Sequence, residues 1–216
     1  MDITYLGHSS FKLRGKKVTV VTDPFDPTLV GLKFPKNLEA DIVTVSHAHP
    51  DHNNVKQVAG TPFVIDGPGE YEVMGVGMIG IPSFHDDKQG KERGRNTIYN
   101  IEIDGIHIVH CGDLGEMLTD KEIEQLGVVD VLLIPVGGTY TITAKQASEL
   151  IAEIEPSIVI PMHYGRDDLD QKTFSELAPL PTFLKIMAKE DAVAQPKLVI
   201  TKDKIPDTMQ VVVLES

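Results

Sequence analysis

The amino-acid sequence predicts an α/β domain in which β-sheets are covered by helices. About ten short runs rich in β-branched and other apolar residues are typical of strands, and four segments with helical signals lie among them. Hydrophobic residues make up 41% of the chain and charged residues 24%, as is usual for soluble globular proteins. No linker, repeat or low-complexity stretch divides the 216 residues, so we expect a single domain over residues 1–216.

Strands are expected along the whole chain. Gly15-Lys16 supplies the turn between the first two, which pair antiparallel, and Asp104-Gly105 supplies a second hairpin turn. The continuous apolar run at residues 42–46 fits a strand that is buried on both faces. The expected strands are residues 3–13, 18–22, 42–46, 63–65, 76–81, 96–103, 106–109, 131–135, 158–161, 197–201 and 209–214.

Four helices are expected between the strands. Thr119 and Glu122 form a capping box, which predicts a helix through about residue 126. Thr143 caps a longer amphipathic helix that ends before Pro156. The other two expected helices are residues 52–59 and 171–177. Two long loops, which are often functional, are expected at residues 24–38 and 86–95.

Charge and cysteine content limit the classes of function. The net charge is −12, and an acidic surface repels phosphate backbones, so nucleic-acid binding is disfavoured. Cys111 is the single cysteine, and the first residues lack the basic region and apolar block of a signal peptide. No apolar run approaches the ~18 residues of a membrane span. We therefore expect a cytoplasmic protein that has no membrane partner.

The strongest chemical signal is the run S-H-A-H-P-D-H at residues 46–52, which follows the expected buried strand. Imidazole and carboxylate are the groups that zinc and similar divalent metals bind in proteins. His47 and His49 stand two residues apart on an extended segment, so their side chains point the same way and can bind one ion. Asp51 and His52 come after the chain turns, so they can reach a second ion.

Four ligands cannot fill two metal sites, so other parts of the chain must contribute. Three candidates each follow an expected strand, namely His85, Asp113 and His163. Each of them alone would be read as a surface or capping residue. The dense run at residues 46–52 favours the ligand role for all three.

This pattern resembles the metallo-β-lactamase superfamily over nearly the whole chain. The motif H-x-H-x-D-H is followed by a histidine, an aspartate and a histidine after successive strands. Residues 5–11, 83–87 and 110–115 are similar to the branch of small metal-dependent hydrolases that includes the ascorbate-6-phosphate lactonases. The resemblance implies an αββα sandwich, with two mixed sheets and outer helices.

The resemblance also implies the metal ligands and the cofactor. The implied ligands are His47, His49 and His85 for the first metal, Asp51, His52 and His163 for the second, and Asp113 as the bridge between them. Asp51 and Asp113 are the expected catalytic carboxylates. The expected cofactor is two divalent metal ions, with zinc favoured by the mixed ligands and manganese and iron as alternatives.

Other polar residues are expected near the metals. The resemblance makes Asp23 an acid that orients a ligand histidine, the alternative being a turn aspartate before proline. His8 either lines the site or is a strand histidine bonded to the backbone. His107 and His110 are expected to be structural, and Cys111 to be a buried, inert thiol.

The expected loop at residues 86–95 carries the only dense run of basic residues in this acidic chain, namely Lys88, Lys91, Arg93 and Arg95. The run is either a solvated charged loop or a clamp for a phosphate or carboxylate of the substrate. If it is a clamp, Arg93 and Arg95 bind substrate. Tyr140, in the segment after another strand, is expected to contact substrate as well.

The sequence therefore predicts a dinuclear metal-dependent hydrolase. Two cations that share a water lower its pKa, and the bridging hydroxide attacks a carbonyl or phosphorus without a serine or cysteine nucleophile. The expected substrate is a small, anionic molecule with a lactone, ester or phosphodiester bond. The alternative is a metal-binding regulatory or sensor module without turnover, and a nuclease that processes RNA conflicts with the net charge. A monomer and a homo-oligomer both stay open.

Overall fold

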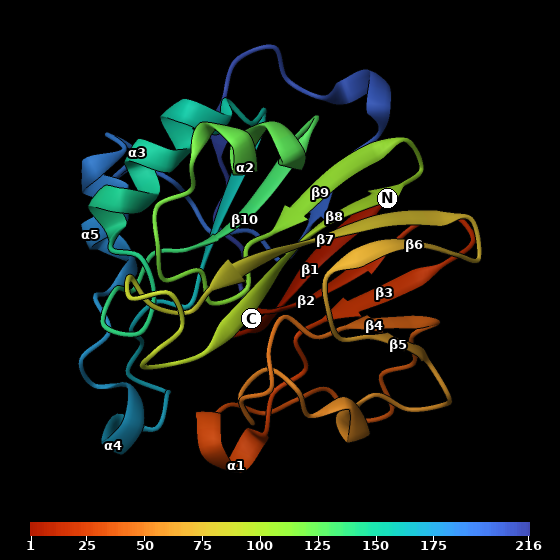
Figure 1. Cartoon of the computed structure of the whole chain (residues 1–216), viewed down its shortest axis with the longest axis horizontal. Helices are drawn as coiled ribbons and strands as arrows, with labels where there is room; N and C mark the ends of the chain where they lie inside the picture. The colour runs from red at the N-terminus through yellow and green to blue at the C-terminus, as the bar shows by residue number, and fades with distance from the viewer.

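Two mixed β-sheets face each other in the middle of the molecule (Figure 1). This computed structural model describes all residues from Met1 to Ser216. The first sheet has the order β12 (Leu198–Val199), β1 (Asp2–Gly7), β2 (Ser10–Arg14), β3 (Thr19–Thr22), β4 (Ile42–Thr44) and β5 (Phe63–Ile65). The second has the order β13 (Gln210–Val211), β11 (Ile158–Met162), β10 (Val131–Pro135), β9 (Ile106–His110), β8 (Arg95–Ile103), β7 (Val76–Phe84) and β6 (Gly69–Val73).

Strand directions decide which loops meet. In the first sheet β1 pairs antiparallel with β2 and β2 with β3, while β3 and β4 are parallel, so β1, β3 and β4 share a direction. In the second sheet β7 and β9 are both antiparallel to β8, while β9, β10 and β11 are parallel. Strands that run in one direction end at the same edge of a sheet. The segments after β1, β3 and β4 therefore leave one edge, and those after β7, β9 and β11 leave one edge of the second sheet.

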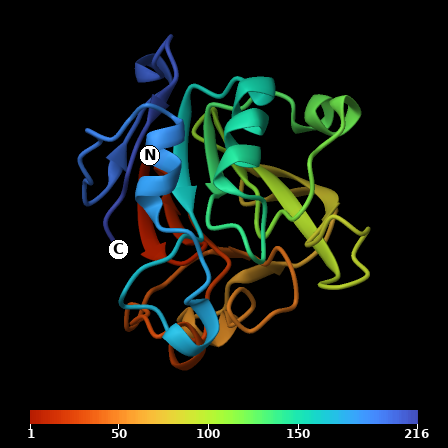
Figure 2. The ribbon, with the colours of Figure 1, turned by 90° about the vertical axis from the view of Figure 1, so that its left-hand side faces the viewer.

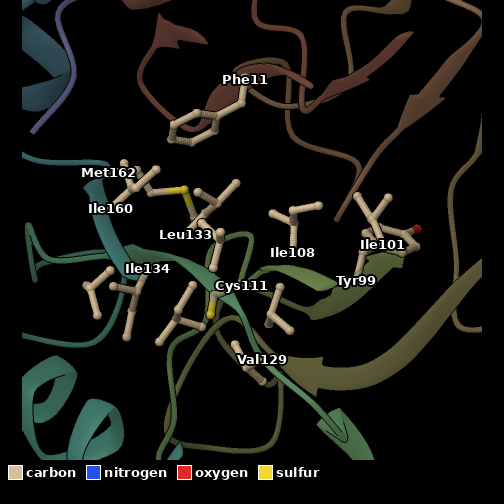
Figure 3. Packing of buried hydrophobic residues seen from close by; sticks show 14 of the residues in the cluster. Phe11, Tyr99, Ile101, Ile108, Cys111, Val129, Leu133, Ile134, Ile160 and Met162 are labelled. Atoms are coloured by element: carbon tan, nitrogen blue, oxygen red, sulfur yellow. The ribbon is translucent and has the colours of Figure 1, made fainter. Parts of the chain in front are cut away.

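The larger hydrophobic core lies between the two sheets and continues under the helices. Figure 3 shows Phe11 of the first sheet above the strand that carries Leu133, whereas Cys111 and Val129 lie below that strand. A smaller cluster covers the other face of the first sheet. Because neighbouring residues of a strand point to opposite faces, Val20 of β3 joins the larger core and Val21 joins the smaller one.

The helices lie outside the sheets. The structure contains α1 (Pro27–Val30), α2 (Asp120–Leu126), α3 (Ala144–Ile154), α4 (Gln171–Phe174), α5 (Leu180–Ile186) and two 3₁₀ helices, Val55–Gln57 and Lys202–Lys204. In Figures 1 and 2, α3 and α5 lie side by side, and α1 and α4 lie at another end of the molecule. Helix α3 buries Ala147, Leu150 and Ile151 and packs against β10 and α5. No helix is long and apolar enough to cross a membrane.

The expected fold class is confirmed, because the chain forms two mixed sheets with helices outside them. The outer layer is uneven. The longest helix, α3, packs on the second sheet. The outer face of the first sheet is covered mainly by residues 24–38, which include α1, and by α4. The capping box predicted at Thr119 forms, and Thr143 caps α3 as predicted, where Gln146 completes a second capping box that was not predicted.

The helix expected at residues 52–59 is wrong. Only the 3₁₀ helix Val55–Gln57 forms there. The backbone N–H groups of His52 and Asn53 both donate to the carbonyl of His49, and the N–H of Asn54 donates to the carbonyl of Pro24 at 2.7 Å. This segment is therefore tied to the loop at residues 24–38 instead of continuing as a helix.

Other boundaries also differ from the expectation. The single strand expected at residues 3–13 is divided into β1 and β2, because His8 turns the chain with a φ of 56°. Helix α4 ends at Phe174 rather than at about residue 177. The sequence did not predict β6, α1 or α5. Both missed helices carry proline in the first turn, where the missing N–H costs nothing because it has no intrahelical partner.

Candidate metal centre

The loops that follow the aligned strands bring the seven predicted ligands together around Asp113. Its Oδ2 atom lies 3.1 Å from Nε2 of His52, 3.3 Å from Nε2 of both His85 and His163, and 4.0 Å from Nε2 of His47. The Asp113 side chain is 2% exposed. One buried carboxylate oxygen therefore faces histidines from three different loops.

The histidines and acids form three groups, of which two contain the expected ligand sets and the third joins Asp23, His47 and His52. In the first, single ligand atoms of His47, His49 and His85 lie within 4.8 Å of one another. In the second, Asp51, His52 and His163 meet the same limit together with His8. Nε2 of His8 lies 3.1 Å from Oδ2 of Asp51. His8 thus lies inside the cluster, rather than only beside it.

Several buried polar atoms of the cluster have no hydrogen-bond partner. They include Oδ1 of Asp113 and the Nε2 atoms of His52 and His163, which lie within 3.3 Å of Oδ2 of Asp113 but are not aligned for a hydrogen bond with it. Leaving one buried polar group unsatisfied costs about 1–3 kcal/mol, so natural structures seldom gather several without a reason. Imidazole nitrogens and carboxylate oxygens converging on one buried volume are suitable ligands for a divalent cation. The donor set therefore fits the metals that the sequence predicts.

Asp23, at the end of β3, holds two parts of the cluster. Its Oδ2 lies 2.8 Å from Nδ1 of His52, and its Oδ1 and Oδ2 accept hydrogen bonds from the backbone N–H and hydroxyl of Ser46 at 2.8 and 2.5 Å. With Nδ1 engaged in this way, Nε2 of His52 faces Asp113. The contact is the one expected for an acid that orients a ligand histidine.

Three residues of this site have a left-handed backbone. His8, Asp23 and His163 have φ values of 56°, 41° and 51°, a region that residues other than glycine seldom adopt. Tight packing holds His163 in place. Its N–H donates to the carbonyl of His8 at 2.8 Å, and a Cβ atom at Gly137 would lie 2.1 Å from its carbonyl oxygen. Only glycine at position 137 allows this approach.

Burial and neighbouring charges set the protonation of the cluster. Burial lowers the pKa of His47 to about 3 and that of His8 to about 4, so both imidazoles are neutral at pH 7. Although burial raises the pKa of Asp113, His163 and His52 lower it well below the ordinary value. His52 is the exception. Burial lowers its pKa, but Asp113 and Asp51 raise it well above the ordinary value, so a cation that binds there must displace a proton.

The basic loop winds around the buried carboxylate of Asp86. This carboxylate accepts backbone N–H groups of Lys88, Gly90, Glu92 and Arg93 at 2.7–3.0 Å. Although burial raises the pKa of Asp86, these four donors lower it well below the ordinary range. The loop is therefore held in one conformation directly after His85.

Of the three predicted substrate contacts, the structure brings two together. The Arg93 guanidinium lies 5.7 Å from the centre of the Tyr140 ring. The Tyr140 hydroxyl donates to the carbonyl of Thr173 at 2.7 Å, and its ring meets Phe174, which in turn contacts the His8 ring at 4.9 Å. Arg95 is exposed instead on β8, opposite Phe84.

The remaining predicted residues lie outside the cluster. His110 is buried, with Nε2 2.7 Å from the carbonyl of Ser9, and His107 is half-buried beside Asn100. Cys111 is buried, and burial raises its pKa to about 12, as expected for an inert thiol. Sequence reasoning missed Ser46 and Asn96. Ser46 directly precedes the histidine run, but Asn96 gives no local signal because its partners are far away in sequence.

Comparisons with known proteins show which family the chain is similar to. A family model for the β-lactamase superfamily domain matches residues 2–163. A UPF0173 metal-dependent hydrolase of Thermococcus onnurineus is 32% identical, and the match covers 76% of this chain and 85% of the relative. A crystal structure described as a Zn-dependent hydrolase of the metallo-β-lactamase superfamily, from Thermotoga maritima, is 39% identical with a TM-score of 0.79 and covers 99% of this chain and 97% of that one.

A more distant structure shares the fold. Igni18, a metallo hydrolase from the archaeon Ignicoccus hospitalis, is 23% identical with a TM-score of 0.69, and the match covers 93% of this chain and 99% of that one. The family model alone spans most of the chain, and the identity to the first two relatives exceeds 30%. The chain therefore belongs to the metallo-β-lactamase superfamily, and within it to the UPF0173 family of metal-dependent hydrolases.

Proposed function

We propose that this hydrolase is dinuclear and cleaves a lactone, ester or phosphodiester bond of a small, anionic molecule. One observation carries the proposal. Oδ2 of Asp113 lies within 3.3 Å of Nε2 atoms from both ligand groups, His85 of the first and His52 and His163 of the second. A carboxylate in this position is suited to be shared by two cations.

The chain's residues would hold two divalent ions. The proposed ligands are His47, His49 and His85 for the first ion, Asp51, His52 and His163 for the second, and Asp113 for both. When bound, two such ions activate a shared water near neutral pH and polarise the bond under attack. Zinc is the proposed metal because the ligands mix imidazole and carboxylate, with manganese and iron as alternatives.

The surrounding residues have distinct parts in this proposal. Asp23 holds Nδ1 of His52, so that Nε2 stays directed at Asp113. Asp51 and His49 are the half-buried members of the cluster, so substrate reaches the site on their side. We propose that the Asp51 carboxylate accepts the proton that the attacking water loses. Nε2 of His8 lies 3.1 Å from this carboxylate and keeps it in place.

The basic loop supports an anionic substrate. Arg93 is held over Tyr140, and Asp86 fixes the loop from which Arg93 projects, so its guanidinium is in place before substrate binds. The ring contacts from Tyr140 through Phe174 to His8 connect this cation to the second ligand group. The proposed resemblance of residues 83–87 to the branch of small metal-dependent hydrolases that includes the ascorbate-6-phosphate lactonases also favours a small anionic metabolite. Arg95 is exposed, so we propose that it contributes less than Arg93 to substrate binding.

The setting we propose is the cytoplasm, with a small molecule as the partner. The single cysteine, Cys111, is buried and free, which suits a reducing compartment. The net charge of −12 disfavours nucleic acid as substrate.

Turnover by the reconstituted protein tests the proposal. Metal-depleted protein would be loaded with zinc, manganese or iron and offered matched charged and neutral lactones, esters and phosphodiesters. Hydrolysis that requires two bound ions per chain is the expected result. Two bound ions without turnover of any member of the panel would favour the alternative, a metal-binding sensor module.

A further inference from the structure

A buried carboxamide, that of Asn96, holds the loop that carries Asp113. Asn96 is 2% exposed and lies near the start of β8. Its Nδ2 donates to the hydroxyl of Ser83 at 2.8 Å and to the carbonyl of Cys111 at 2.9 Å, while its Oδ1 accepts the backbone N–H of Asp113 at 3.0 Å. One side chain thus fixes the peptide groups on both sides of Gly112.

The loop packs closely against Asn96. Gly112 adopts a φ of 55°, and a Cβ atom there would lie 2.4 Å from Oδ1 of Asn96 and 2.5 Å from Cβ of Ser46. The backbone before Asp113 therefore packs directly on the carboxamide. Because this backbone sets where the Asp113 carboxylate points, a change at position 96 would move Oδ2 relative to the three histidines around it.

Asn96 also connects the other ligand-bearing loops. Ser83, which receives a hydrogen bond from Nδ2, stands two residues before His85. The next residue, Thr97, donates its backbone N–H at 2.9 Å to the carbonyl of Ser46, which directly precedes His47. Three segments of the chain that carry proposed ligands therefore meet at residues 96–97.

We infer that Asn96 is a positioning residue, which places the Asp113 carboxylate for both metal ions. The inference rests on the proposed function, because it treats Asp113 as the shared ligand. A neutral carboxamide suits the task, since one end must donate to a carbonyl while the other accepts an N–H. An aspartate at position 96 would direct an oxygen at the Cys111 carbonyl and bring a second negative charge close to Asp113.

The test compares two buried asparagines on the same strand. Asn100 lies four residues further along β8, is 6% exposed, and donates from Nδ2 to the carbonyl of Leu126 at 2.6 Å, outside the metal cluster. Asn96→Ala and Asn100→Ala each delete a buried carboxamide that holds a loop. The measurements on the full chain are zinc affinity by chelator competition and the visible absorption spectrum of the cobalt(II)-substituted protein.

Asn96→Ala is expected to weaken zinc affinity by roughly 10- to 100-fold, as is typical for a partner that orients a ligand, and to change the cobalt spectrum. Asn100→Ala should lower the melting temperature but leave zinc affinity and spectrum unchanged. If the alanine variant does not fold, Asn96→Asp, which nearly keeps the shape of asparagine, should weaken zinc affinity as well. Unchanged affinity and spectrum in the folded Asn96 variant, or an equal loss in Asn100→Ala, would overturn the inference.

Asp113→Asn separates this inference from the proposed function. If Asp113→Asn keeps both metals, the shared-ligand proposal fails and takes the positioning role with it. If Asp113→Asn loses metal while Asn96→Ala binds zinc as the unaltered chain does, only the positioning role fails.

Discussion

Asp113 is the residue on which both proposed metal sites depend. Asp113→Asn keeps the shape of the side chain but removes the charge that would hold two cations beside three histidines. Breaking a buried charge pair costs about 3–5 kcal/mol, so we expect metal affinity to fall by roughly 10²- to 10⁴-fold and turnover to be lost. Circular dichroism should show an intact fold. The loss of turnover is measured as kcat/KM with added zinc.

His107→Ala is the matched control for that variant. His107 is half-buried on β9 and lies outside the cluster, so its removal should leave activity nearly unchanged. If His107 proved essential and His85 dispensable, the third ligand of the first site would be misassigned.

Arg93 carries the prediction about substrate charge. One hydrogen bond to a charged group contributes about 1.5–3 kcal/mol, so Arg93→Ala should lower kcat/KM for an anionic lactone or ester by roughly 10- to 100-fold more than for a neutral analogue. Arg95→Ala, an exposed arginine on the next strand, should change the charged-to-neutral ratio less, and the double variant should show the combined loss. An unchanged ratio in the double variant would mean that the charges of the loop are only solvated and do not bind substrate.

At the scale of elements, helix caps give the most direct stability prediction. The Thr143 hydroxyl accepts the backbone N–H of Gln146 at the start of α3. Thr143→Ala should lower the free energy of unfolding by about 0.5–2 kcal/mol without changing metal content, because the hydroxyl that is removed bonds only to Gln146. Ser148→Ala in the same helix, which removes a hydroxyl bonded only to the carbonyl of Lys145, should have little effect. A loss of bound metal in Thr143→Ala would contradict this separation of the helix from the site.

Elements with local signals were predictable, and those that depend on distant contacts were not. Both capping boxes lie within four consecutive residues, so Thr119 and Thr143 marked their helices correctly. The segment after His52 has an acceptable helical sequence, but its N–H groups bond to His49 and Pro24, which only the folded chain brings near. Helix α5 was not predicted, because its N-cap residue is Pro179 and no side chain caps it, so it carries no local cap signal.

The same difference between local signals and distant contacts applies to the site. The seven proposed ligands were predictable because four of them lie within six residues and the other three each follow a predicted strand. Asn96 was not predictable, since its hydrogen bonds reach residues 83, 111 and 113 on two other segments. The place of Arg93 over Tyr140 depends on how the loop winds around Asp86, which composition does not specify.

At the scale of the whole molecule, the buried histidines predict how stability varies with pH in metal-free protein. His8 and His47 have folded pKa values of about 4 and 3, lowered by burial from 6.5, so between about pH 6.5 and 4 the unfolded chain binds more protons. Stability therefore falls as the pH falls through this window. His52 has the opposite effect on stability, because Asp113 and Asp51 outweigh burial and raise its pKa. Its contribution to stability is present below pH 6.5 and is lost as the pH rises through the raised pKa.

Metal-free protein should therefore be most stable near pH 6.5 and less stable at pH 5 and pH 8. Urea unfolding at these three pH values gives the comparison. With zinc bound, His52 holds no proton, so the decline toward pH 8 should disappear. A stability that rises steadily from pH 6.5 to pH 8 without metal would mean that His52 is not charged in the folded chain.

The number of metal ions per chain tests the central claim most directly. Elemental analysis of gently purified or zinc-reconstituted protein should give close to two ions per chain. The reason is that the other six proposed ligands form two groups, and Asp113 lies close to histidines of both. A ratio close to one would make Asp113 a ligand of a single site rather than a bridge. A ratio near zero after reconstitution with zinc, manganese and iron would contradict the account.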